Sequence, residues 1–150
     1  MLHLLRAGDA LAQKNAATCL GHLVKDDSNL SIVLSLSGVH ALVVKTKETN
    51  DPEMCLIAAI ALATLASRLK DCNEASAGAA QCFSNELVDV LLALNLAAKD
   101  EPLLVAKSIL NLSTILSRSH TSEGWLEKMI EHGALVFFFL RVHACNKHRH

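Results

Sequence analysis

The feature that most constrains the fold of this chain is a segment that occurs three times. Each copy opens with an acidic residue, continues through a stretch rich in Ala and Leu, and closes on a similar tail. The copies span residues 9–26, 51–68 and 101–118. Their starts lie about 42 and then about 50 residues apart, a spacing that is typical of stacked helical units. The repeat therefore predicts a stack of similar helical modules.

The local signals in these copies favour helices. Pro52 and Pro102 directly follow the acidic residue in the second and third copies, and Pro is common at the first position of a helix, where a missing N–H costs nothing. The chain of 150 residues is 51% hydrophobic, with only two Pro and six Gly. Ala and Leu lose little conformational freedom in a helix. We therefore expect one all-α domain over residues 1–150.

Two shorter helices are expected between the long ones. Residues 28–37 are predicted to form a short helix closed by Gly38, which would supply the left-handed residue that ends a helix, and residues 39–45 to form the next. The same order recurs at 123–132, Gly133 and 134–142. The third copy lacks this glycine, and only residues 87–92 are predicted to form a shorter helix there. The extra length of this copy is assigned to a loop around residues 71–84. The predicted unit has a short, a medium and a long helix.

The long helices are apolar around most of their circumference. In the second copy, residues spaced three, four and seven apart are apolar, and so are most residues between them; the spaced set is Met54, Ile57, Ala58, Ala61, Leu62 and Leu65. Such a helix must be covered on several sides. In a solenoid, neighbouring repeats supply that cover.

This order of elements resembles the armadillo repeat family over nearly the whole chain. Residues 13–23 (QKNAATCLGHL) look like the third helix of an armadillo repeat, and residues 36–43 (LSGVHALV) look like its glycine turn and second helix. The resemblance implies a right-handed α–α superhelix of about three repeats with incomplete ends. It also implies a concave groove, lined by the third helices, that binds partner proteins.

The resemblance also indicates which positions face this groove. Many family members carry a Trp and, four residues later, an Asn whose amide holds the backbone of a bound peptide. The Trp-equivalent positions are Thr18, Ile60 and Leu110; the Asn-equivalent positions are His22, Thr64 and Thr114; one turn further on lie Lys25, Arg68 and Arg118. Hydroxyls and an imidazole cannot make the paired amide contacts, and only a shift of three residues would place Asn111 there. A less regular protein interface is expected, in which the three cations form a basic edge or interact with the helix dipoles.

The two ends of the chain show no polar cap. Residues 1–7 resemble the end of a second helix, and Phe137, Phe138 and Phe139 have no third helix after them. Solenoids normally end in caps with a polar outer face. We therefore expect a fragment or short isoform of a longer solenoid, or a segment that assembles end to end through Leu2, Leu5 and the Phe run.

A metal-binding or redox-sensing protein is the alternative function. The candidate ligands are His143, Cys145, His148 and His150. Their spacing matches no structural zinc site, so a solvated tail is the simpler interpretation. The five cysteines include no CxxC pair and are expected to be reduced thiols, with Cys19 and Cys55 acting as small hydrophobes.

Composition and motifs exclude several function classes. A formal net charge of -1 removes the electrostatic case for a nucleic-acid partner. No phosphate-binding loop, GxSxG or HExxH motif is present, so neither an enzyme nor a cofactor is predicted. The longest uncharged stretch is too short for a membrane span, and the N-terminus does not match a secretory signal. An intracellular, cytoplasmic interaction protein is expected, with Asp26 as a helix cap, His40 and His132 as structural residues, and Trp125 packed between repeats.

Overall fold

The computed structural model describes residues 1–69, 76–118 and 124–132, and all regular structure in them is α-helical. The all-α prediction is therefore confirmed. The helices in chain order are α1 (Leu2–Ala7), α2 (Ala10–Leu23), α3 (Asp27–Ser35), α4 (Gly38–Glu48), α5 (Pro52–Arg68), α6 (Ser76–Asn85), α7 (Leu87–Ala97), α8 (Pro102–Arg118) and α9 (Trp125–Glu131).

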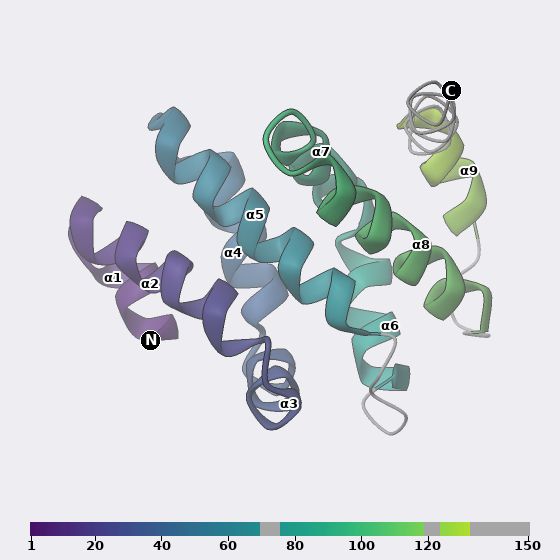
Figure 1. Ribbon diagram of the computed structural model, residues 1–150, viewed down its shortest axis with the longest axis horizontal. Coiled ribbons are helices and arrows are strands. Elements are labelled where there is room, and N and C mark those ends of the chain that lie inside the picture. Colours follow the sequence, from purple (N-terminus) through teal and green to yellow (C-terminus); the bar gives the residue numbers. More distant parts are fainter. Residues whose placement is uncertain (70–75, 119–123, 133–150) are drawn as a thin grey trace, which may run out of the picture.

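The three long helices form one layer of the molecule. Helices α2, α5 and α8 lie side by side in Figure 1, with α5 between the other two. Helix α4 packs against α1, α5 and α7, and α7 packs in turn against α5 and α8, so the medium helices form a second layer behind the long ones. The order short, medium, long occurs twice, as α3–α4–α5 and as α6–α7–α8.

Acidic side chains fix the starts of three helices. Asp9 accepts a hydrogen bond from the Ala12 N–H at 2.8 Å, and Asp51 accepts one from the Glu53 N–H at 3.0 Å. Asp26 accepts from the N–H groups of residues 28 and 29 at 2.9 and 3.3 Å, which confirms its predicted role. These carboxylates satisfy N–H groups that have no partner within the helix.

Helix α5 is the centre of the hydrophobic core. All five of its alanines and two of its three leucines are buried: Ala58, Ala59, Ala61, Ala63, Ala66, Leu62 and Leu65. Helices α2, α4, α7 and α8 all pack against it. Small side chains let these neighbours approach closely, which explains why the helix is apolar on nearly every side.

The turn between α3 and α4 differs from its prediction. Ser37, and not Gly38, has the left-handed conformation, with φ 60° and ψ 37°. Gly38 is instead the buried first residue of α4, and a Cβ atom there would lie 2.3 Å from Val33 Cγ1 and 2.7 Å from the Val33 carbonyl oxygen. The glycine is required by the close approach of α4 to α3, and Ser37 makes the turn.

We predict that Gly38→Ala lowers the free energy of unfolding by about 2–3 kcal/mol, because the new methyl group overpacks against backbone that cannot move independently. Ser37→Gly is the matched control, since it removes the cost of a side chain in the left-handed region and should raise stability by about 0.5–1 kcal/mol. Urea unfolding followed by circular dichroism measures both. Equal tolerance of the two changes would contradict this account of the turn.

The predicted loop around residues 71–84 is largely wrong, because α6 begins at Ser76 and ends at Asn85. Ala79, Ala80 and Phe83 are buried on one face of this helix. Their spacing of one, three and four residues is a helical pattern, but polar neighbours and Gly78 obscured it in the sequence. The third copy of the unit therefore has its short helix.

Other expectations about single residues have mixed outcomes. Leu2 and Leu5 were predicted to take part in end-to-end assembly. Leu5 is completely buried, so its side chain is not available for such a contact, and Leu2 packs against the core. Cys19 is exposed, which contradicts its interpretation as a buried hydrophobe, whereas Cys55 is half-buried. Helix α1 packs against α2, which follows it after a short turn. Phe137, Phe138, Phe139 and the predicted helix at 134–142 lie outside the described residues.

Within the described segments, no single helix is long and apolar enough to cross a membrane. Helices α3 and α4 reach the required length and composition only as a pair, and they are bent by 69° at the break between them.

Candidate functional site

A hollow of about 530 Å³ lies on the face formed by the long helices. Helices α2 and α5 line most of it, and α8 contributes Leu104 from its first turn, next to Glu101. Its apolar lining includes Ala17, Ile57 and Ala61. The hollow is therefore a groove with an apolar floor between two parallel helices.

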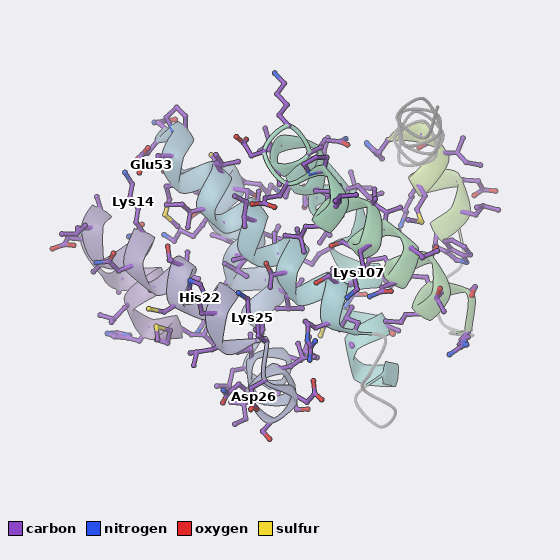
Figure 2. The ribbon with its side chains drawn as sticks, viewed as in Figure 1. Lys14, His22, Lys25, Asp26, Glu53 and Lys107 are labelled. Carbon is purple, nitrogen blue, oxygen red and sulfur yellow. The ribbon has the colours of Figure 1, made fainter. Side chains whose placement is uncertain are left out.

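The structure brings together six of the nine residues predicted to face a partner. Thr18 and His22 line the hollow from α2, Lys25 from the turn after it, and Ile60, Thr64 and Arg68 from α5. Figure 2 shows His22 near the end of α2 and Lys25 just beyond it. The positions that were matched between the first and second copies therefore line the same hollow.

The other three predicted residues do not line this hollow. Leu110, Thr114 and Arg118 lie further along α8, which reaches the hollow only at its beginning. Leu110 is 51% exposed, so the outer face of α8 is open, but it lies beyond the groove between α2 and α5. The hollow does not extend to these three positions, because α5 lies between α8 and α2.

Two small residues make the floor of the groove possible. Gly21 on α2 faces Ala61 on α5, and a Cβ atom at Gly21 would lie 3.6 Å from the Ala61 Cα atom. The backbones of the two helices are therefore close at this point. Larger side chains here would push the helices apart and fill the hollow.

The hydroxyl groups in the groove already donate hydrogen bonds to backbone carbonyls of their own helices. Thr18 Oγ1 donates to the Lys14 carbonyl and Thr64 Oγ1 to the Ile60 carbonyl, both at 2.9 Å. Ser67 Oγ donates to the Thr64 carbonyl at 2.7 Å. Because a hydroxyl has a single hydrogen, the nitrogen groups of the groove are the donors open to a ligand.

The cations of the groove differ in their pairing. Arg68 Nη2 lies 2.9 Å from Asp27 Oδ1, so one arm of this guanidinium is already paired. Lys25 and His22 are exposed, and neither forms an ion pair within the part of the chain that the structure describes. Of the three cations predicted to form a basic edge, Lys25 and Arg68 line the groove and Arg118 does not.

A second ionic cluster joins the beginnings of α2 and α5. Lys14 Nζ lies 2.8 Å from Asp51 Oδ2 and also pairs with Glu53. The hydrogen bond with Asp51 raises the pKa of the Lys14 amine, and the same bond lowers the pKa of the Asp51 carboxyl. Figure 2 shows Lys14 and Glu53 at the end of the layer away from Lys25. This cluster fixes the register of the two helices without entering the hollow.

Sequence reasoning missed the role of Asn111. Its side chain is buried, and Nδ2 donates to the Ser67 carbonyl at 2.7 Å and approaches the Ala66 carbonyl at 3.4 Å. These carbonyls belong to the last turn of α5, where C=O groups have no partner within the helix. Asn111 therefore caps α5 from α8 and takes no part in an amide ladder. An Asn in an otherwise apolar stretch was the available signal.

Ionic contacts also join the medium helices, away from the groove. His40 Nδ1 pairs with Glu86, and Lys47 Nζ lies 3.1 Å from Asp89 Oδ2. The His132 carbonyl accepts a hydrogen bond from Asn95 Nδ2 at 3.3 Å, and Trp125 packs against the core as predicted. The side chain of His40 therefore has a structural contact, in agreement with the prediction from sequence, whereas the contact given for His132 is through its backbone.

No metal site is visible in residues 1–69, 76–118 and 124–132, where no group of three or more His, Cys, Asp or Glu side chains could hold an ion. The candidate ligands His143, Cys145, His148 and His150 lie outside the described residues. The chain matches no protein-family model, no curated protein and no solved structure.

Proposed function

We propose that this chain is an armadillo-like solenoid segment that binds a protein partner on the face formed by α2, α5 and α8. The repeated order of short, medium and long helices supports this architecture, because each long helix lies beside the equivalent helix of the next unit. In this proposal the chain has no catalytic activity and contributes a binding surface.

The observation that carries the proposal is the groove itself. It combines an apolar floor with a rim of Thr18, His22, Thr64 and two cations, a composition suited to a short segment of another protein. Most of the lining residues of the groove belong to helices. A segment that binds there would lose its own freedom but would not require the helices to be reordered.

A capture experiment tests the proposal. The wild-type chain, a His22→Glu/Thr64→Glu variant and a Thr114→Glu variant are immobilised and exposed to lysate of the cells that produce the protein. Both residues of the double variant line the hollow, whereas Thr114 lies outside it. Circular dichroism first establishes that all three are equally helical.

We expect a partner that is retained by the wild type and by Thr114→Glu but lost from the double variant, because two carboxylates in the groove exclude an apolar segment. Cross-linking through a photoreactive residue introduced at Thr18 should then join this partner to α2. Equal retention by all three proteins would place the binding surface elsewhere and would contradict the proposal.

A further inference from the structure

The middle of the groove has no donor for the backbone of a partner. The three hydroxyl groups that line it donate to carbonyls of their own helices, and the backbone N–H groups of α2 and α5 are bonded within the helices. The remaining donors are on His22, Lys25 and Arg68, towards the C-terminal ends of α2 and α5. An extended segment that crossed the groove would depend on water to pair its carbonyl groups.

The same part of the groove is apolar and only half covered. Ile57 and Ile60 on α5 and Leu104 on α8 line the hollow and pack against the core, yet each remains half-buried. Gly21 and Ala61 are small, so a partner can approach the backbones of both helices closely at this point. The hollow of about 530 Å³ has room for several side chains. Burial of the three large apolar side chains is therefore the main favourable contribution available to a ligand.

A helix and an extended segment differ in what they require of such a surface. An extended backbone carries N–H and C=O groups along both edges, which must be paired by the binding site or by water. A helix pairs these groups internally and presents apolar side chains at positions i, i+3, i+4 and i+7 on one face. A surface with large apolar contacts and no donor in its middle therefore favours a helix.

The long helices run in the same direction, which gives the groove two distinct ends. Lys14 pairs with Glu53 and, further along both helices, Gly21 faces Ala61. The hydrogen bonds from α8 to the carbonyls of α5 also follow the same order along the two helices. Glu101, which directly precedes α8, therefore lies at the end where the long helices begin.

The charges balance at the end where the long helices finish. Arg68 pairs with Asp27, and Asp26 directly follows Lys25 in the sequence. This end therefore gives a charged ligand no clear preference.

The other end of the groove has an excess of negative charge. The carboxylate of Glu101 lines the hollow and forms no ion pair or hydrogen bond within the described ranges. The Lys14 amine at the start of α2 is already held by two carboxylates, those of Asp51 and Glu53. A basic side chain is the complementary group for this end.

We propose that the groove binds an amphipathic helix of the partner, a step that rests on the proposed function of the groove. The apolar face of this helix packs on Ile57, Ile60 and Leu104, and its backbone requires no donor from the chain. A Lys or Arg at the end of the helix nearest to Glu101 pairs with that carboxylate. The apolar contacts supply most of the affinity, and the exposed ion pair selects the direction in which the helix lies.

A library of random peptides of about 16 residues, long enough for four helical turns, tests this assignment with the whole chain as bait. Enriched peptides should carry apolar residues at helical spacing with no Pro between them. The most enriched peptide is then isotope-labelled, and its carbon chemical shifts in the complex should be those of a helix. Gly at a solvent-facing position should weaken its binding about fivefold relative to Ala, because Gly is unfavourable in a helix.

Glu101→Gln tests the ion pair. This variant should bind the enriched peptide about threefold more weakly than the wild type, as expected for an exposed pair. Replacement of the basic residue of the peptide by Gln should cause the same loss with the wild type and no further loss with Glu101→Gln. Glu131→Gln is the matched control, because it removes the same charge from α9, outside the hollow. Equal losses in the two variants would overturn the pairing with Glu101.

Two further outcomes separate the two proposals. A bound peptide with the chemical shifts of an extended chain, which is still rejected by His22→Glu/Thr64→Glu, would overturn the helix and leave the groove as the binding surface. If no peptide is selected by the wild type in preference to that double variant, both proposals fail.

Discussion

Leu62→Ala is expected to lower the free energy of unfolding by about 3–5 kcal/mol, the upper part of the range for a buried leucine. Leu62 is completely buried in the middle of α5, and that helix contacts α2, α4, α7 and α8. Its neighbours along the helix are mostly alanines, which have no flexible side chains with which to fill the cavity. Because small domains are stabilised by about 5–15 kcal/mol in total, this change removes a large fraction of the stability.

Urea unfolding of wild type and variant measures the effect. Leu103→Ala on α8 is the control, since Leu103 is 68% exposed and its truncation should change stability by less than about 0.5 kcal/mol. A change in the slope of the transition would show that the repeats unfold separately. A loss below about 1 kcal/mol for Leu62→Ala would contradict the central position of α5.

The long helices could be predicted from the sequence because several local signals agree at the same positions. An acidic cap precedes Pro52 in one copy, and a continuous Ala and Leu stretch follows it, so propensity, capping and periodicity all indicate the same start. The same reasoning located the start of α3 at Asp26. These signals act within a few residues and need no knowledge of the tertiary structure.

Features that depend on neighbouring helices could not be predicted in this way. The need for Gly38 arises from Val33, whose contact distance is set by the angle between α3 and α4. Helix α6 carries its few large apolar residues among small and polar ones, and the burial of Phe83 against its neighbours reveals its apolar face. Packing between elements decides both cases, and a single sequence shows it only indirectly.

The candidate groove was predicted on two of its three helices. His22 and Thr64, which were matched by the offset between the first and second copies, both line the hollow, and Gly21 and Ala61 bring their helices together. The third copy has the same residue pattern, but the order of the helices in space places Thr114 beyond the hollow. Residue equivalence along a repeat therefore does not by itself establish that side chains share one cavity.

Asn111→Asp is expected to destabilise the chain by about 3–5 kcal/mol near neutral pH, although the two side chains have nearly the same shape. The amide of Asn111 donates to the Ser67 carbonyl at 2.7 Å in a buried position. An ionised carboxylate has no hydrogen to donate there, faces two carbonyl oxygens, and lies at the negative end of α5. Asn111→Leu removes the donor without adding charge and should cost only about 1–3 kcal/mol.

The pH dependence of the two variants separates the effect of charge from the effect of the lost hydrogen bond. Burial and the end of α5 disfavour the ionised form, so the pKa of the introduced Asp is raised above its unfolded value of about 3.9. The destabilisation is complete above the folded pKa and decreases as the pH falls from that value towards about 3.9, where the acid becomes protonated and can donate to Ser67. Differences from wild type, measured by urea unfolding at about pH 7 and about pH 5, should therefore shrink for Asn111→Asp and stay constant for Asn111→Leu. Parallel behaviour of the two variants would show that residue 111 does not cap α5, and that the contact between α5 and α8 rests on apolar packing alone.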